Sequence, residues 1–104
     1  MDIKYGVILT EKAKFELDSI YQYISKSFMA EGTAKRFIDK LKKSILRLED
    51  MPESCSIIKE HTFREEYRKL VINNYIAIYR IDKDNKKVYI TRIVYGGRNY
   101  LNDI

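Results

Sequence analysis

The sequence contains few of the residues that build disulfides or metal centres. Its 104 residues include one cysteine, Cys55, and one histidine, His61. A single cysteine cannot form an internal disulfide, which fits a reducing compartment, and no Cys or His pair has metal-ligand spacing. We therefore expect no bound metal and no cofactor. For both residues we expect a place in a loop or in the core rather than a catalytic role.

Long apolar runs and targeting signals are also missing. No apolar run approaches the roughly 20 residues that span a bilayer, and residues 1–9 lack a long hydrophobic segment followed by a small-residue cleavage site. The chain has no internal repeat and no low-complexity segment. These absences predict a cytoplasmic protein with no membrane association.

The sequence does contain the composition of one folded domain. Hydrophobic residues make up 45% of the chain and charged residues 34%, and a chain of this length can bury roughly two-thirds of its unfolded surface. We assign residues 1–104 to a single domain. The net charge is +5, and residues 57–100, with ten Lys and Arg against five Asp and Glu, hold the whole surplus. A nucleic acid or an acidic protein is therefore a possible partner.

The C-terminal part of the chain predicts three consecutive antiparallel strands. Residues 67–72, 75–81 and 87–95 are rich in β-branched and aromatic side chains. Asn73 and Asn74 separate the first two strands, and a two-residue hairpin turn needs positive φ, which Asn tolerates. A polar turn separates the second strand from the third.

The N-terminal half predicts a strand followed by two amphipathic helices. Residues 3–9 form the strand, and Thr10 is placed to cap the first helix. Thr33 is placed to cap the second helix, which Pro52 ends. The apolar residues of the first helix are Ala13, Leu17, Ile20, Tyr21, Ile24 and Phe28. Those of the second helix are Ala34, Phe37, Ile38, Leu41, Ile45 and Leu48.

The order of these elements predicts an α+β fold. An N-terminal strand precedes an antiparallel helical hairpin, which packs on one face of a mostly antiparallel, twisted sheet. A short strand over residues 56–60 adds a further element, so the order is β-α-α-β-β-β-β or the same with one strand fewer.

The strand over residues 75–81 has apolar side chains on both faces. Tyr75 and Tyr79 point to one face with Ala77 and Ile81, while Ile76 and Ile78 point to the other. Because the helices can cover only one face, another chain is expected on the second. The alternative is that half-exposed tyrosines simply pack at the surface.

Five segments of the sequence resemble the RelE/ParE superfamily of bacterial toxins from type II toxin–antitoxin modules. They are LTEKAKFELDSIYQYI, AKRFIDKLKKSILRLEDMPES, YRKL, NYIAIYRID and VYITRIVYGGRNY. The resemblance implies a small cytosolic growth inhibitor that forms a hetero-oligomer with a cognate antitoxin, which also represses their shared operon. The antitoxin is then the chain that would cover the strand at Tyr75 and Tyr79.

Two branches of the superfamily imply different chemistry. RelE-like members are ribosome-dependent mRNA interferases that use Lys, Arg and Tyr to stabilise the charge that develops on phosphate. Lys69 and Arg98 match such positions, and Tyr100 would replace a later C-terminal Tyr. Ile76 stands where RelE-like enzymes carry an Arg.

ParE-like members poison DNA gyrase without chemistry of their own, and this branch is favoured. The helical hairpin closed by Pro, Ile76, Arg68 and the RIVYGGRNY ending resemble it more closely. The implied target-binding residues are Arg68, Arg92, Tyr95 and Arg98. A third hypothesis is an inactive toxin-like module that only binds the antitoxin.

Overall fold

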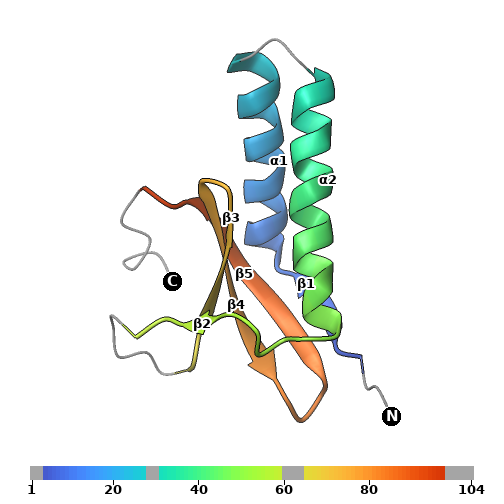
Figure 1. Cartoon of the computed structure of the whole chain (residues 1–104), viewed down its shortest axis with the longest axis vertical. Helices are drawn as coiled ribbons and strands as arrows, with labels where there is room; N and C mark the ends of the chain where they lie inside the picture. Colours follow the sequence, from blue (N-terminus) through green and yellow to red (C-terminus); the bar gives the residue numbers. More distant parts are fainter. Residues whose placement is uncertain (1–3, 28–30, 60–64, 98–104) are drawn as a thin grey trace.

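The computed structural model describes residues 4–27, 31–59 and 65–97, and within them it has the predicted order of elements. The strands are β1 (Gly6–Leu9), β2 (Ser56–Ile57), β3 (Arg68–Ile72), β4 (Tyr75–Asp82) and β5 (Lys87–Tyr95). The helices are α1 (Glu11–Ser27), α2 (Glu31–Leu46) and a 3₁₀ turn, η1 (Arg47–Glu49). The predicted α+β class is confirmed (Figure 1).

Thr10 caps α1 as predicted. Its Oγ1 accepts a hydrogen bond from the amide of Ala13 at 3.2 Å, and its hydroxyl donates to the carbonyl of Thr91 at 3.2 Å. The first contact satisfies an amide that the helix leaves unpaired, and the second ties the start of α1 to β5.

The cap predicted for α2 is wrong. The helix begins at Glu31, so Thr33 lies inside it and its Oγ1 accepts a hydrogen bond from the Arg36 guanidinium at 3.3 Å. The helix continues through Gly32, because one glycine costs a helix only about 1 kcal/mol. Both predicted apolar stripes do face the core, except that Phe28 lies outside the described residues.

The sheet has the strand order β1-β5-β4-β3-β2. β1 runs parallel to β5, with Gly6 opposite Lys87, and the other pairs are antiparallel. The turn between β3 and β4 has the predicted positive φ at Asn73, 53°. β2 is shorter than predicted because it pairs with only two residues of β3, Arg68 and Lys69.

Apolar clusters pack on both faces of the sheet. Ala77 and Tyr79 of β4 are fully buried against the helices, together with Val88 and Ile90 of β5. On the opposite face a smaller cluster comprises Ile58, Ile76, Ile78 and Val94, with Tyr67 packed against it. Ile76 and Ile78 are 8% and 0% exposed, so the expectation that this part of the second face needs another chain to cover it is wrong.

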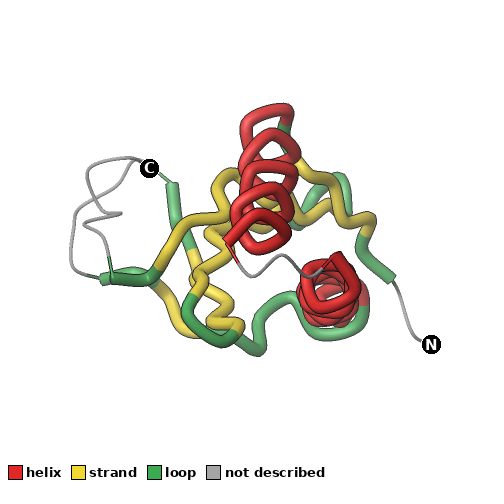
Figure 2. Tube along the Cα trace, turned by 90° about the horizontal axis from the view of Figure 1, so that it is seen from above, coloured by secondary structure: helices red, strands yellow, loops and turns green. Residues whose placement is uncertain are grey.

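The helical hairpin extends beyond one end of the sheet that it covers (Figure 1). In Figure 1 the upper parts of α1 and α2 rise beyond the turn that joins β3 to β4. Figure 2 shows that the helices are inclined to each other, since one is seen end-on and the other obliquely. Among the described residues, no helix has the length and apolar character needed to cross a membrane.

Candidate functional site

Arg92, a predicted target-binding residue, is buried in an ion pair. Its Nη2 and Nε lie 2.7 and 2.9 Å from the two carboxylate oxygens of Glu16, and the side chains are 8% and 16% exposed. Glu16 Oε1 also accepts the amide of Ile93 at 3.0 Å. This carboxylate therefore links α1 to the part of β5 that follows the residues paired with β1. Arg92 in this position ties α1 to β5.

Arg68, the second predicted arginine, secures the loop that follows α2. Its Nη1 donates to the carbonyls of Cys55 at 2.7 Å and Glu53 at 3.2 Å, and its side chain is 12% exposed. On the other side of the loop, the hydroxyl of Tyr79 donates to the carbonyl of Pro52 at 2.8 Å. Nη1 of Arg68 is therefore held by backbone carbonyls, while Nη2 lies 3.5 Å from Glu66 and the buried Nε has no hydrogen-bond partner among the described residues.

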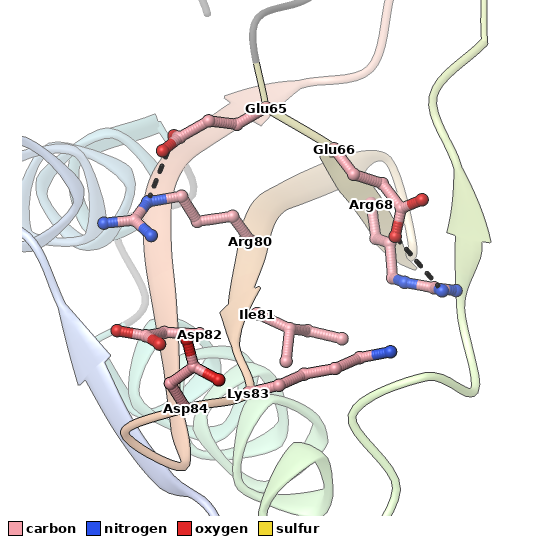
Figure 3. A pocket seen from close by; sticks show the side chains of 8 residues that line it. All are labelled: Glu65, Glu66, Arg68, Arg80, Ile81, Asp82, Lys83 and Asp84. Atoms are coloured by element: carbon pink, nitrogen blue, oxygen red, sulfur yellow. Dashed lines mark hydrogen bonds and ion pairs between the residues drawn. The ribbon is translucent and has the colours of Figure 1, made fainter.

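A cavity of about 500 Å³ lies beside Arg68, and Figure 3 shows the eight residues that line it. Charges of both signs face each other across it. Arg80 lies 3.5 Å from Glu65, Arg68 lies 3.5 Å from Glu66, and Lys83 lies 3.3 Å from Glu53 at the rim. Because each cation already has a carboxylate partner, the cavity is poorly suited to hold an anion.

Two lining residues of this cavity have further partners. Hydrogen bonds from Asn85 hold the pKa of Asp82 below its usual value and shape the turn before β5. The guanidinium of Arg80 stacks over the ring of Tyr89, 4.5 Å from its centroid. These contacts give both charged groups structural roles.

A second surface hollow, of about 480 Å³, is basic. Among the described residues, Arg68, Lys69 and Lys59 line it with Cys55, Ser56 and Ile57. Lys69, predicted from the resemblance, is thereby brought together with Lys59, which the sequence analysis missed. The pairing of β2 with β3, which puts Ser56 opposite Lys69 and Ile57 opposite Arg68, brings the segment with Lys59 to this strand, and no local sequence pattern indicates that pairing.

Tyr79, predicted to contact the antitoxin, belongs to the core. Its side chain is 0% exposed, and burial raises the pKa of its hydroxyl far above the usual value, with a hydrogen bond to Cys55 adding to the shift. In this position Tyr79 has no surface to offer to another chain. The alternation along β4 placed it correctly on the same face as Tyr75, but that face is the one covered by the helices.

Tyr75 and Tyr95 instead meet at the end of the sheet. Their rings form an edge-to-face pair with centroids 5.9 Å apart, and Tyr75 also packs against Phe37 of α2 at 5.5 Å. Burial raises the pKa of Tyr75, and the nearby hydroxyls of Tyr23 and Tyr95 add to the shift. We call these four residues, Tyr23, Phe37, Tyr75 and Tyr95, the aromatic corner. Tyr23 was not predicted as a site residue.

Two predicted residues, Arg98 and Tyr100, lie outside the described residues, as does His61. Within residues 4–27, 31–59 and 65–97 there is no group of three or more His, Cys, Asp or Glu side chains that could hold a metal ion.

Comparison with known families identifies one match over almost the whole chain. A family model described as the ParE toxin of the type II toxin–antitoxin system parDE matches residues 7–100. Among curated protein sequences, none matches.

Several solved structures share the fold. A chain of the chromosomal ParDE system from P. aeruginosa has a TM-score of 0.72 at 18% identity, covering 88% of this chain and 96% of that chain. A chain of the RelBE2 toxin–antitoxin complex from Mycobacterium tuberculosis has a TM-score of 0.67 at 17% identity, covering 91% and 97%. A mutant of the E. coli toxin RelE in the free state has a TM-score of 0.62 at 14% identity, covering 96% and 92%. At these identities the likeness is one of fold.

Proposed function

Because this chain belongs to the ParE toxin family of type II toxin–antitoxin systems, we propose that it inhibits growth by binding DNA gyrase, without chemistry of its own, until a cognate antitoxin neutralises it. The observation that carries the proposal is the match to the ParE family over residues 7–100. Gyrase is cytoplasmic, so the proposal places the toxin there. The M. tuberculosis structure of the same fold is a toxin–antitoxin complex, which supports an antitoxin as partner.

The side chains of the strands are consistent with a binding protein. Arg92 is neutralised by Glu16, and Arg68 is occupied by the carbonyls of the loop after α2. General acid–base catalysis needs a titratable group placed to move a proton. Burial raises the pKa values of Tyr75 and Tyr79, and hydrogen bonds from Asn85 lower the pKa of Asp82. None of these shifts brings a pKa closer to neutrality.

A second candidate is a ribosome-dependent mRNA interferase, and the basic hollow around Lys59 and Lys69 favours it. Two lysines and an arginine gathered at one hollow would hold phosphate and stabilise the charge that develops during cleavage. In this reading Lys69, Arg98 and Tyr100 would be catalytic, with Lys59 added to them.

Expression in cells with the antitoxin repressed tests both candidates. A gyrase poison gives cleaved DNA complexes and an SOS response before translation fails. An mRNA interferase gives immediate translation arrest and cuts in ribosome-bound message. An inactive module that only binds the antitoxin gives neither, and this outcome would contradict both candidates.

Matched lysine variants separate the two candidates further. If the toxin poisons gyrase, Lys59→Ala and Lys69→Ala should each change that poisoning by less than about twofold. If it cleaves message, each of the two variants should abolish the cleavage. Lys83→Ala is the control, because Lys83 is an exposed lysine that pairs with Glu53 away from the basic hollow. Loss of gyrase poisoning in Lys69→Ala but not in Lys83→Ala would place the gyrase contact on the basic hollow.

A further inference from the structure

We propose that the aromatic corner, Tyr23, Phe37, Tyr75 and Tyr95, is the surface with which the toxin docks onto an acidic surface of its target protein. The inference rests on the proposed function, because it assigns a surface to the gyrase contact. It is separate from the basic hollow, which Lys59, Arg68 and Lys69 form around β2 and β3.

The first reason is the exposure of large rings at one place. Tyr23 is 64% exposed and Tyr95 53%, while Tyr75 and Phe37 are half-buried between them and the core. Exposed aromatic groups that share an apolar base are typical of protein interfaces, where tyrosines supply large contact areas at a low cost in side-chain entropy. An apolar side chain of a partner could pack against these rings.

The second reason is that the Tyr75 and Tyr95 rings are already held in place. Tyr95 packs edge-on against Tyr75, and its own ring lies so close to Gly97 that a Cβ there would come within 2.5 Å of Tyr95 Cε2. The strand that carries Tyr95 is tied to α1 by the contacts of Glu16 with Arg92 and Ile93. A surface fixed before binding loses less conformational freedom when the partner arrives.

The third reason is charge, which decides the chemistry of the partner. The segments that carry Tyr23, Tyr75 and Tyr95, residues 19–27, 72–76 and 92–97, contain no Asp or Glu. Asp39, which follows Phe37 on α2, lines a different hollow between the two helices. Lys26 lies one turn beyond Tyr23 on α1, and the Lys40 amine lies 3.0 Å from the Asn73 side chain beside Tyr75. An acidic protein surface fits this environment.

A nucleic acid fits the corner less well than an acidic protein. Single-strand sites combine stacking rings with cations that follow the backbone. The guanidinium nearest along β5, that of Arg92, is neutralised by Glu16. Two lysines on different helices do not make such a groove.

The exposed rings give a partner access to this surface, since Tyr23 and Tyr95 are both more than half exposed. Tyr23 lies in the last two turns of α1, and Tyr75 is the first residue of β4, directly after the turn from β3. The upper parts of α1 and α2 rise beyond that turn (Figure 1).

The test uses the complex with antitoxin for purification and the released toxin for binding to purified gyrase. Tyr23→Ser and Tyr95→Ser should each weaken gyrase binding at least tenfold and reduce toxicity in cells, while antitoxin affinity changes less than threefold. Gly97→Ala, which forces the Tyr95 ring to move, should weaken gyrase binding in the same direction without removing a ring. Phe15→Ser is the matched control, because Phe15 is a 72% exposed ring of α1 outside the corner.

The possible outcomes separate this inference from the proposed function. If wild type binds gyrase and both tyrosine variants bind equally well, the docking surface is wrong and the gyrase proposal stands. If wild type arrests translation without binding gyrase, the proposed target is wrong, and the corner stands only if both variants weaken the arrest. Three other results would assign the aromatic corner to another occupant and overturn the inference. They are a loss of antitoxin affinity in the tyrosine variants, self-association of the chain through Tyr23 and Tyr95, and oligonucleotide binding that depends on these two residues.

Discussion

Arg92 and Tyr95 lie three residues apart on β5 in opposite surroundings. Arg92 is 6% exposed and held by Glu16, whereas Tyr95 is 53% exposed at the end of the sheet. The facing residues of α1 repeat the contrast, because the Glu16 side chain is 16% exposed and Tyr23, two turns later, is 64% exposed. Along this junction the charged groups are inside and the aromatic groups outside.

The comparison shows that residue type alone is a poor guide to function in this fold. Arg68 and Arg92 were predicted to bind a target. In the structure Arg68 donates to a carbonyl of the loop after α2, and Arg92 pairs with Glu16. Exposed tyrosines are usually read as ordinary surface residues, yet here they gather in one place. Unfolding free energies of single variants test whether the buried arginines stabilise the fold and the exposed tyrosines do not.

The largest effect is expected for Arg92→Ala. It leaves the buried Glu16 carboxylate without its charged partner, which costs about 3–5 kcal/mol of unfolding free energy. Urea denaturation followed by circular dichroism measures the loss. The control is Lys14→Ala, which removes the exposed pair with Glu11 and should cost less than about 0.5 kcal/mol. Equal effects of the two variants would refute a structural role for Arg92.

Arg68→Ala should have the next largest effect, about 2–3 kcal/mol. The variant loses the charged hydrogen bonds to the carbonyls of Glu53 and Cys55. Limited proteolysis should cut the loop over residues 52–55 sooner than in wild type. Arg80→Ala, which removes an arginine stacked on Tyr89, is the control and should cost about 1 kcal/mol or less. If the loop stays protected in Arg68→Ala, the guanidinium does not secure it.

Tyr79→Phe should cost about 1 kcal/mol at neutral pH, because it removes the hydrogen bond to the carbonyl of Pro52. Burial raises the pKa of Tyr79 above its usual value of 10.0, so the folded state keeps the proton that the unfolded state loses. The stabilisation from burying the protonated Tyr79 hydroxyl is complete below about pH 10 and falls as the pH rises further, because only the unfolded state then loses the proton. Urea midpoints between pH 8 and 11 should therefore fall more steeply in wild type than in Tyr79→Phe, and parallel curves would show that Tyr79 is not the group responsible.

Tyr23→Ser should have the smallest effect on stability, within about 0.5 kcal/mol, because its side chain is mostly exposed. Ile24→Ser is the contrast at the adjacent position, where the side chain is 9% exposed in the core, and should cost more than about 2 kcal/mol. Thermal unfolding of both variants measures the difference. A large loss in Tyr23→Ser would mean that the aromatic corner is a structural cluster.

Local patterns predicted most of the fold. The stripes of both helices, the Thr10 cap and the turn at Asn73 depend on neighbours within about four residues, and their hydrogen bonds and φ values follow from residue type. Helix starts are less certain, since capping and helical positions differ by small energies. Thr33 illustrates this, because a glycine did not stop the helix.

The candidate site could not be predicted in the same way. The pair of Glu16 and Arg92 joins residues separated by 76 positions, and no local pattern indicates which arginine turns inward. Lys59 becomes a candidate only when β2 pairs with β3. Tyr23 joins Tyr75 and Tyr95 only through the packing of α1 on β5.

The parallel pairing of β1 with β5 has a consequence for when the toxin can fold during translation. Thr10 and Thr91, which join at the end of this pair, are 81 positions apart, so at ribosomal speeds of 5–20 residues per second the edge strand waits roughly 4–16 s for its partner. In that interval the helical hairpin emerges with its apolar face uncovered and without Arg92 or Tyr95. A nascent chain therefore has no completed sheet and no aromatic corner. A cell that makes antitoxin at the same time gains those seconds to intercept the toxin.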